Sequence, residues 1–205
     1  MRALLTMGLM ASLAVGAVLA QAPPNAAPAV PTVVKVGDMA PDFSLQGTDG
    51  KTHKLSDYRG KQAVVIAWFP KAFTQGCTIE CKSLAENGDK IRMYDVAYFM
   101  ASTDTVEDNT KFAKATSVTL QSRGGGPATV VDKKEADFPL LADPNKEVAG
   151  KYGVLMANGQ VANRWTFYID KTGKISYIEK TVKPATSAEH MVAKLAELKV
   201  PMNHK

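Results

Sequence analysis

Blocks of apolar residues separated by amphipathic stretches predict strands that alternate with helices along this chain. The continuous apolar run Gln62–Phe69 is typical of a strand buried on both faces, and Pro70 ends it. Val96–Ala101 predicts a second strand of the same kind. Between the two, apolar residues recur at loose helical spacing over Gly76–Met93, which predicts a connecting helix.

The remaining elements follow from similar patterns and from local stop signals. The N-terminal part predicts a hairpin, with strands at Phe43–Leu45 and Thr52–Leu55 joined by a turn. The other expected elements are a helix at Val106–Ala115 with Asp104 as its cap, a strand at Phe138–Leu141, a helix at Lys146–Tyr152 ended by Gly153, strands at Trp165–Ile169 and Ile175–Ile178, and a last helix from the capping box Thr186–Glu189 to about Lys199. This order predicts an α/β layer fold with a central mixed sheet flanked by helices.

One segment, Ser117–Glu135, does not fit the alternation. It contains the glycine-rich stretch Arg123–Pro127, followed by the strand-like Ala128–Val131. We interpret it as an inserted loop or a small hairpin. An unstructured segment of this length is uncommon inside a compact domain. It is therefore either a functional lid or a surface insertion that the fold tolerates, and of the two we favour the insertion.

The N-terminus has the pattern of a secretory signal peptide, with Arg2 followed by an apolar stretch that ends in small residues. We expect residues 1–20 to be the signal peptide, cleaved after Ala20; the alternative is an uncleaved membrane anchor. Residues 21–32 form a Pro/Ala-rich linker, and residues 33–201 form the folded domain. The sequence thus predicts a protein exported to the bacterial periplasm, with no stable membrane association after cleavage, where cysteines meet oxidising conditions.

Composition narrows the possible functions. Hydrophobic residues make up 45% and charged residues 22% of the chain, as in ordinary globular proteins. The net charge of +5 comes from scattered lysines without a dense basic run, which argues against nucleic-acid binding. The three histidines lie far apart in the sequence, and the methionines form no metal-binding run. We therefore expect neither a metal nor another cofactor.

The candidate chemistry lies at Cys77, between the predicted buried strand and the helix that follows it. A cysteine in the first turn of a helix experiences the positive end of the helix dipole, which favours the nucleophilic thiolate. Thr74 can turn its hydroxyl toward the sulfur or toward a bound oxygen, and Pro70 would fix the loop and shield the sulfur. Position alone leaves equally open an ordinary buried thiol or one half of a structural disulfide.

The second cysteine, Cys81, lies four residues after Cys77. On an intact helix such residues have Cβ atoms about 5–6 Å apart, whereas a disulfide needs about 3.8 Å. The pair can close only if part of the helix unwinds. A structural disulfide across so short a ring gains little entropy. The spacing therefore favours a disulfide that forms and breaks during turnover.

Four segments, in order, resemble the peroxiredoxin family. They are Val36–Phe43, which is similar to the opening segment of the family; Pro70–Cys77 with its Pro-x-x-x-Thr-x-x-Cys pattern, extended by Thr78-Ile79-Glu80; Phe138–Val154; and Arg164–Asp170, which is similar to the second active-site strand. The resemblance covers about Val33 to Lys180 apart from the insertion, and it is nearest to the bacterioferritin-comigratory, or Q-type, subgroup.

The resemblance implies a thioredoxin-like fold and reduction of hydrogen peroxide and organic hydroperoxides. It implies that Cys77 forms a sulfenic acid, that Cys81 resolves it, and that an external dithiol such as a thioredoxin-like protein reduces the disulfide. Arg164 would stabilise the charge that moves from sulfur to the leaving oxygen, and Thr74 would help to hold the peroxide. Glu80 would orient an arginine, the alternative being a solvated helix residue. We expect a monomer or a weak dimer.

This chain departs from the subgroup in two places. The subgroup commonly has its resolving cysteine five residues after the reactive one, where this chain has Lys82. The insertion is the second departure.

Two other functions are alternatives to a peroxidase. An exported copper chaperone would use Cys77, Cys81 and the distant His190. That family places proline after its cysteines, whereas here Thr78 and Lys82 follow them. A protein thiol–disulfide oxidoreductase usually has Cys-x-x-Cys, which is absent.

Overall fold

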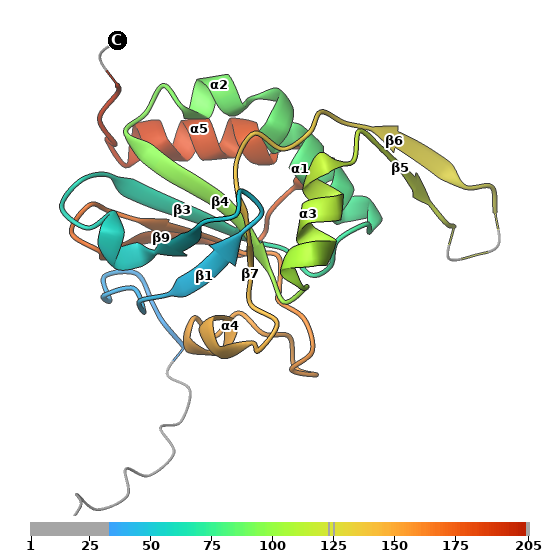
Figure 1. Cartoon of the computed structure of the whole chain (residues 1–205). Helices are drawn as coiled ribbons and strands as arrows, with labels where there is room; N and C mark the ends of the chain where they lie inside the picture. The colour runs from blue at the N-terminus through green and yellow to red at the C-terminus, as the bar shows by residue number, and fades with distance from the viewer. Residues whose placement is uncertain (1–32, 123, 125, 204–205) are drawn as a thin grey trace, which may run out of the picture. The chain divides into compact units, whose positions relative to one another are not determined.

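A seven-stranded mixed sheet forms the centre of the molecule in this computed structural model, which describes residues 33–122, 124 and 126–203 (Figure 1). The strand order is β2-β1-β7-β4-β3-β8-β9. The strands are β1 (Ser44–Gly47), β2 (Thr52–Lys54), β3 (Ala63–Trp68), β4 (Val96–Ser102), β7 (Leu140–Ala142), β8 (Thr166–Ile169) and β9 (Ile175–Glu179). β3, β4 and β7 are parallel, and the other pairings are antiparallel. The predicted mixed sheet with an N-terminal hairpin is confirmed.

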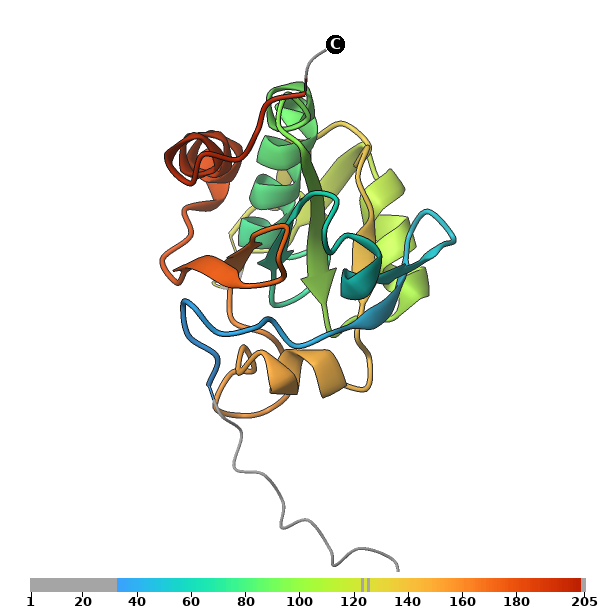
Figure 2. The same ribbon diagram turned by 90° about the vertical axis from the view of Figure 1, so that its left-hand side faces the viewer.

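The central strand β3 is buried on both sides, because helices cover both faces of the sheet. The helices are α1 (Gln75–Glu86), α2 (Gly88–Ile91), α3 (Val106–Lys114), α4 (Glu147–Lys151) and α5 (Ser187–Glu197), with 3₁₀ turns at Leu55–Asp57 and Pro184–Thr186. Val65 and Ala67 of β3 pack in one core cluster with residues of α1, α2, α3 and α5. Val64 and Ile66 pack in a second cluster with α4. Figures 1 and 2 show α5 and α4 on opposite sides of the sheet.

The predicted helix over Gly76–Met93 is two helices rather than one. α1 ends before Asn87, whose backbone leaves the helical region at φ −117° and ψ 13°. The Asn87 side chain donates to the carbonyl oxygen of Ser83 at 3.0 Å, and so it satisfies a carbonyl that the ended helix leaves free. The prediction was therefore right about the helical content and wrong about continuity.

The structure corrects both predicted helix caps. Thr105, and not Asp104, caps α3, since its hydroxyl accepts a hydrogen bond from the Asp108 backbone N–H at 3.1 Å. Thr186 makes no side-chain cap to α5. The 3₁₀ turn before α5 holds Thr186 near φ −117° and ψ 17°, away from the extended conformation that a capping residue needs.

The segment over Ser117–Glu135 contains a small hairpin. Its strands β5 (Ser117–Leu120) and β6 (Thr129–Asp132) pair antiparallel and form a separate two-stranded sheet. In Figure 1 the hairpin extends outward beside α1 and α3. The hairpin alternative of the prediction is confirmed.

The predicted signal peptide at residues 1–20 and the linker at residues 21–32 lie outside the described residues. Within residues 33–122, 124 and 126–203, no helix is both long and apolar enough to span a membrane.

Candidate active site

The reactive segment begins where β3 ends and α1 starts. Thr74 has an extended backbone, and its carbonyl oxygen accepts the backbone N–H of Thr78 at 2.9 Å, which starts the helix. Cys77 lies in the first turn and is fully buried. Cys77 therefore lies at the N-terminal, positive end of the α1 dipole, as the sequence predicts.

Arg164 reaches Cys77 because of the pairing between β3 and β8. The Trp68 backbone N–H donates to the Trp165 carbonyl at 2.8 Å, so the residue before Trp165 lies at the end of β3, close to the start of α1. The Nη2 atom of Arg164 donates to Cys77 Sγ at 3.2 Å. A residue far away in the sequence thus places a permanent positive charge next to the sulfur.

Glu80 fixes the guanidinium of Arg164. The Glu80 carboxylate is fully buried and accepts a hydrogen bond from Arg164 Nη1 in an ion pair. Its other oxygen accepts the Ser187 hydroxyl at 3.4 Å. Burial raises the pKa of Glu80, while the charge of Arg164 acts in the opposite direction. Glu80 is therefore paired with an arginine and buried, so it is not a solvated helix residue.

Thr74 and Pro70 lie in the loop before Cys77, but neither is hydrogen-bonded to the sulfur. The Thr74 hydroxyl donates to the carbonyl oxygen of Lys71 at 2.9 Å. The hydroxyl proton of Thr74 is therefore used in this hydrogen bond, while the hydroxyl oxygen can still accept one. Pro70 is partly buried and lies two residues after the end of β3. Both residues stay candidates for holding the peroxide and shielding the sulfur.

Two residues of the site were missed by the sequence reasoning. A Cβ atom on Gly76 would lie 2.9 Å from Arg164 Nη2, so glycine lets the guanidinium approach the helix. Asp104 is buried and accepts the Ala72 backbone N–H at 2.9 Å and Lys71 Nζ at 2.8 Å. It thereby holds the loop before Cys77. The position of Gly76 beside the cysteine is a usable signal, whereas nothing in the sequence links Asp104 to the loop.

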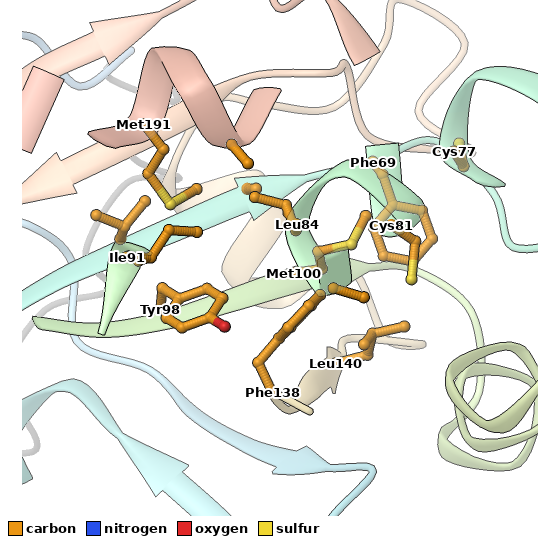
Figure 3. Packing of buried hydrophobic residues seen from close by; sticks show 14 of the residues in the cluster. Phe69, Cys77, Cys81, Leu84, Ile91, Tyr98, Met100, Phe138, Leu140 and Met191 are labelled. Atoms are coloured by element: carbon orange, nitrogen blue, oxygen red, sulfur yellow. The ribbon is translucent and has the colours of Figure 1, made fainter. Parts of the chain in front are cut away.

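Cys81 lies one turn further along α1, and both cysteines are free thiols (Figure 3). Cys81 is fully buried in the same apolar cluster as Phe69 and Met100. Burial raises the pKa of Cys81 to about 11. Since α1 is unbroken from Gln75 to Glu86, the two sulfurs cannot bond in this conformation by the distances given above.

The comparison with known proteins decides the family, because residues 36–178 match the AhpC/TSA family. The chain belongs to this family. It is 32% identical over 165 residues to Peroxiredoxin Bcp of Escherichia coli K12, which covers 78% of this chain and 92% of the relative. It is 28% identical over 172 residues to Peroxiredoxin Bcp of Bacillus subtilis, covering 81% and 96%.

Solved structures agree with the fold. Peroxidoxin BcpB of Mycobacterium tuberculosis superposes with a TM-score of 0.65 at 26% identity, covering 80% of this chain and 97% of that one. Thioredoxin peroxidase I of Plasmodium yoelii gives a TM-score of 0.66 at 22% identity, covering 80% and 91%. The predicted thioredoxin-like fold is confirmed.

The protein is thus a peroxiredoxin of the bacterioferritin-comigratory type, and its activity is that of a thiol peroxidase. Membership of the family implies a hydroperoxide substrate and a thioredoxin-type reductant. The copper-chaperone alternative finds no support among these relatives.

Proposed function

We propose that Cys77 is the peroxidatic residue and that it reacts with hydrogen peroxide and organic hydroperoxides. The observation that carries the proposal is the 3.2 Å hydrogen bond from Arg164 Nη2 to Cys77 Sγ in the first turn of α1. The Cys77 thiolate attacks the terminal peroxide oxygen. A sulfur–oxygen bond forms, the O–O bond breaks, and the other oxygen leaves with its electron pair and takes up a proton to become water or an alcohol.

Arg164 serves this step because negative charge moves from sulfur to the leaving oxygen while its own charge stays fixed. Glu80 holds the guanidinium through Nη1, which leaves Nη2 directed at the reacting atoms. Such a preorganised donor stabilises the transition state without reorganising during the reaction. Thr74 and the Cys77 backbone N–H would hold the peroxide, and Pro70 would limit access of water to the sulfur.

Cys81 resolves the Cys77 sulfenic acid. The Cys81 thiol loses its proton and the sulfur attacks Cys77; the S–S bond forms, the S–O bond breaks, and hydroxide takes up a proton to leave as water. The first turn of α1 has to unwind for this, which carries Cys77 away from Arg164. A thioredoxin-like protein or another external dithiol then reduces the disulfide and becomes a disulfide itself.

The protein works, on this proposal, as a monomer or weak dimer in the bacterial periplasm after cleavage behind Ala20. The positive charge at Arg2 and the apolar stretch after it support export. Mass spectrometry of the protein recovered from a periplasmic fraction tests the cleavage site. An unprocessed chain found in the cytoplasm would contradict it.

Stopped-flow mixing of reduced protein with hydrogen peroxide tests the proposed roles. We expect oxidation by micromolar peroxide within seconds in the wild type and none in Cys77→Ser. Cys81→Ser should keep the first step and accumulate a sulfenic acid that dimedone traps. Equal loss of the first step in both variants would contradict the division of roles between the cysteines.

A further inference from the structure

Lys133, directly after strand β6 of the hairpin, is a buried cation that the reaction described above does not use. Its residue is only 5% exposed. Its Nζ atom donates to the carbonyl oxygens of Ala113 and Lys134, both at 3.1 Å, and lies 5.5 Å from the centre of the Phe112 ring. Among the residues that the structure describes, no carboxylate forms an ion pair with it. Burying a charge is costly unless the charge is paired and hydrogen-bonded, and here the two carbonyl oxygens supply hydrogen bonds but no counter-charge.

The hairpin that carries Lys133 is attached to α1 next to Cys81. Lys82 Nζ donates to the Asp132 carbonyl oxygen at 2.6 Å, and it also pairs with Glu86 at 2.8 Å. Lys82 follows Cys81 in the sequence and Asp132 precedes Lys133. This contact therefore holds the backbone that carries Cys81 against the backbone that carries Lys133.

The surroundings of Cys81 and Lys133 overlap. Cys81, Phe112 and Ala113 pack in one core cluster, and Lys133 lies over Phe112 and donates to Ala113. The ammonium group thus reaches the core region that encloses the Cys81 thiol.

The charges that act on Cys81 oppose one another. Burial raises the pKa of Cys81 most, Lys133 lowers it, and Glu80 and Cys77 raise it. Burial lowers the pKa of Lys133 in turn, while Cys81 and Glu135 favour its charged form. Lys133 therefore contributes the cation that favours a Cys81 thiolate, and it comes from the hairpin and not from α1.

We propose that Lys133 is a positioning residue of the resolving step, whose ammonium group stabilises the Cys81 thiolate while that thiolate attacks the Cys77 sulfenic acid. This inference rests on the proposed function. The proton of the Cys81 thiol goes to solvent, the S–S bond forms, and the hydroxide released from Cys77 takes up a proton to become water. No further oxidant or reductant is needed.

The hydrogen bond between Lys82 and Asp132 also indicates which cysteine moves when the disulfide forms. Unwinding of the turn that contains Cys77 leaves Lys82 bonded to Asp132, so Cys81 keeps its place in the core region that Lys133 reaches, while Cys77 moves toward it. The hairpin is then part of the resolving site. Lys82 takes the position where the resemblance expects a resolving cysteine, and it serves the step by holding Cys81 in place.

Kinetics of the second oxidation step test the proposal. Reduced wild type, Lys133→Met and Lys133→Arg are mixed with hydrogen peroxide and quenched by rapid alkylation, and the disulfide is measured by mass spectrometry between pH 6 and 9. We expect Lys133→Met to slow disulfide formation about tenfold. Loss of a neighbouring cation raises the pKa of a thiol by about one unit or more, which lowers the thiolate fraction about tenfold. Lys133→Arg should restore most of the rate. Lys134→Met is the matched control, because Lys134 is exposed and its side chain loses the same charge.

A second measurement does not depend on peroxidase activity. In the Cys77→Ser background Cys81 is the sole cysteine. Because Cys81 is buried, its alkylation rate by iodoacetamide depends both on opening of α1 and on its thiolate fraction. Lys133→Met should lower this rate relative to Lys134→Met, at equal amide hydrogen exchange of α1. Equal alkylation rates and unchanged disulfide formation would overturn the role of Lys133. Failure of peroxide to oxidise Cys77 in the wild type would instead overturn the proposed function.

Discussion

Replacement of Arg164 by Met removes the cation that contacts Cys77 and leaves its partner Glu80 buried. The guanidinium donates to Cys77 Sγ at 3.2 Å, where charge leaves the sulfur during the reaction. Loss of one preorganised donor typically costs about 3–4 kcal/mol in the transition state, or roughly 10²–10³-fold in rate. We expect this loss in the rate of Cys77 oxidation. Arg164→Lys should recover part of the rate, because one ammonium cannot reproduce the planar guanidinium that bridges Glu80 and the sulfur.

The same substitution should lower the free energy of unfolding. Glu80 is completely buried, so without Arg164 its carboxylate has no counter-ion in the described site, and its pKa, already raised by burial, should rise further. Breaking a buried ion pair on one side costs about 3 kcal/mol or more. The double variant Arg164→Met/Glu80→Gln should regain most of this stability, because it removes the unpaired charge, but it should not regain the rate.

Stopped-flow oxidation and urea unfolding, measured on the same four proteins, separate the two effects. If Arg164→Met is folded and reacts with peroxide at the wild-type rate, Arg164 has no role in the chemistry. If the double variant regains both stability and rate, Arg164 acts only by neutralising Glu80. Either result would refute the reasoning from the 3.2 Å contact.

Three further predictions concern α1. Amide hydrogen exchange over Gly76–Leu84 should be slow in the reduced protein and fast in the disulfide form, with exchange in β3 unchanged, because the first turn of α1 has to unwind. Equal protection in both forms would mean that Cys81 does not resolve Cys77. Gly76→Ala should slow Cys77 oxidation about tenfold by displacing the guanidinium, a fraction of the full loss of that donor; a wild-type rate would show that Arg164 adjusts freely. Disulfide formation should quicken about tenfold per pH unit from pH 7 toward the Cys81 pKa of about 11, and a flat profile would mean that Cys81 attacks from different surroundings.

The sequence alone was sufficient for those parts of the molecule that local patterns specify. The apolar run of β3, buried on both faces, and the alternation of strands and helices predicted the mixed sheet. The position of Cys77 after that strand placed it in the first turn of a helix. The motif around it led to the family before any fold was known. Hydrophobic periodicity and a short contiguous motif are local properties, so no tertiary information is needed to recognise them.

Helix boundaries were decided by contacts that the local pattern does not contain. The helix that contains Cys77 ends at Glu86, before Asn87, and Thr186 is prevented from capping α5 by the turn before it. Asp104, expected to cap α3, instead holds the loop before Cys77 through Ala72 and Lys71. Asn87 and Asp104 thus bond to groups that the tertiary structure brings to them, whereas the backbone at Thr186 is held away from the conformation of a cap.

The reactive site itself depends on long-range pairing. Arg164 meets Cys77 because β8 lies beside β3, and Lys133 reaches the region of Cys81 because the hairpin rests on α1. Burial raises the pKa of Glu80 and of Cys81, whereas Arg164 and Lys133, respectively, act in the opposite direction. Sequence determines which groups are present, but desolvation and charge pairing depend on distances between residues far apart in the chain, and only the tertiary structure fixes those distances.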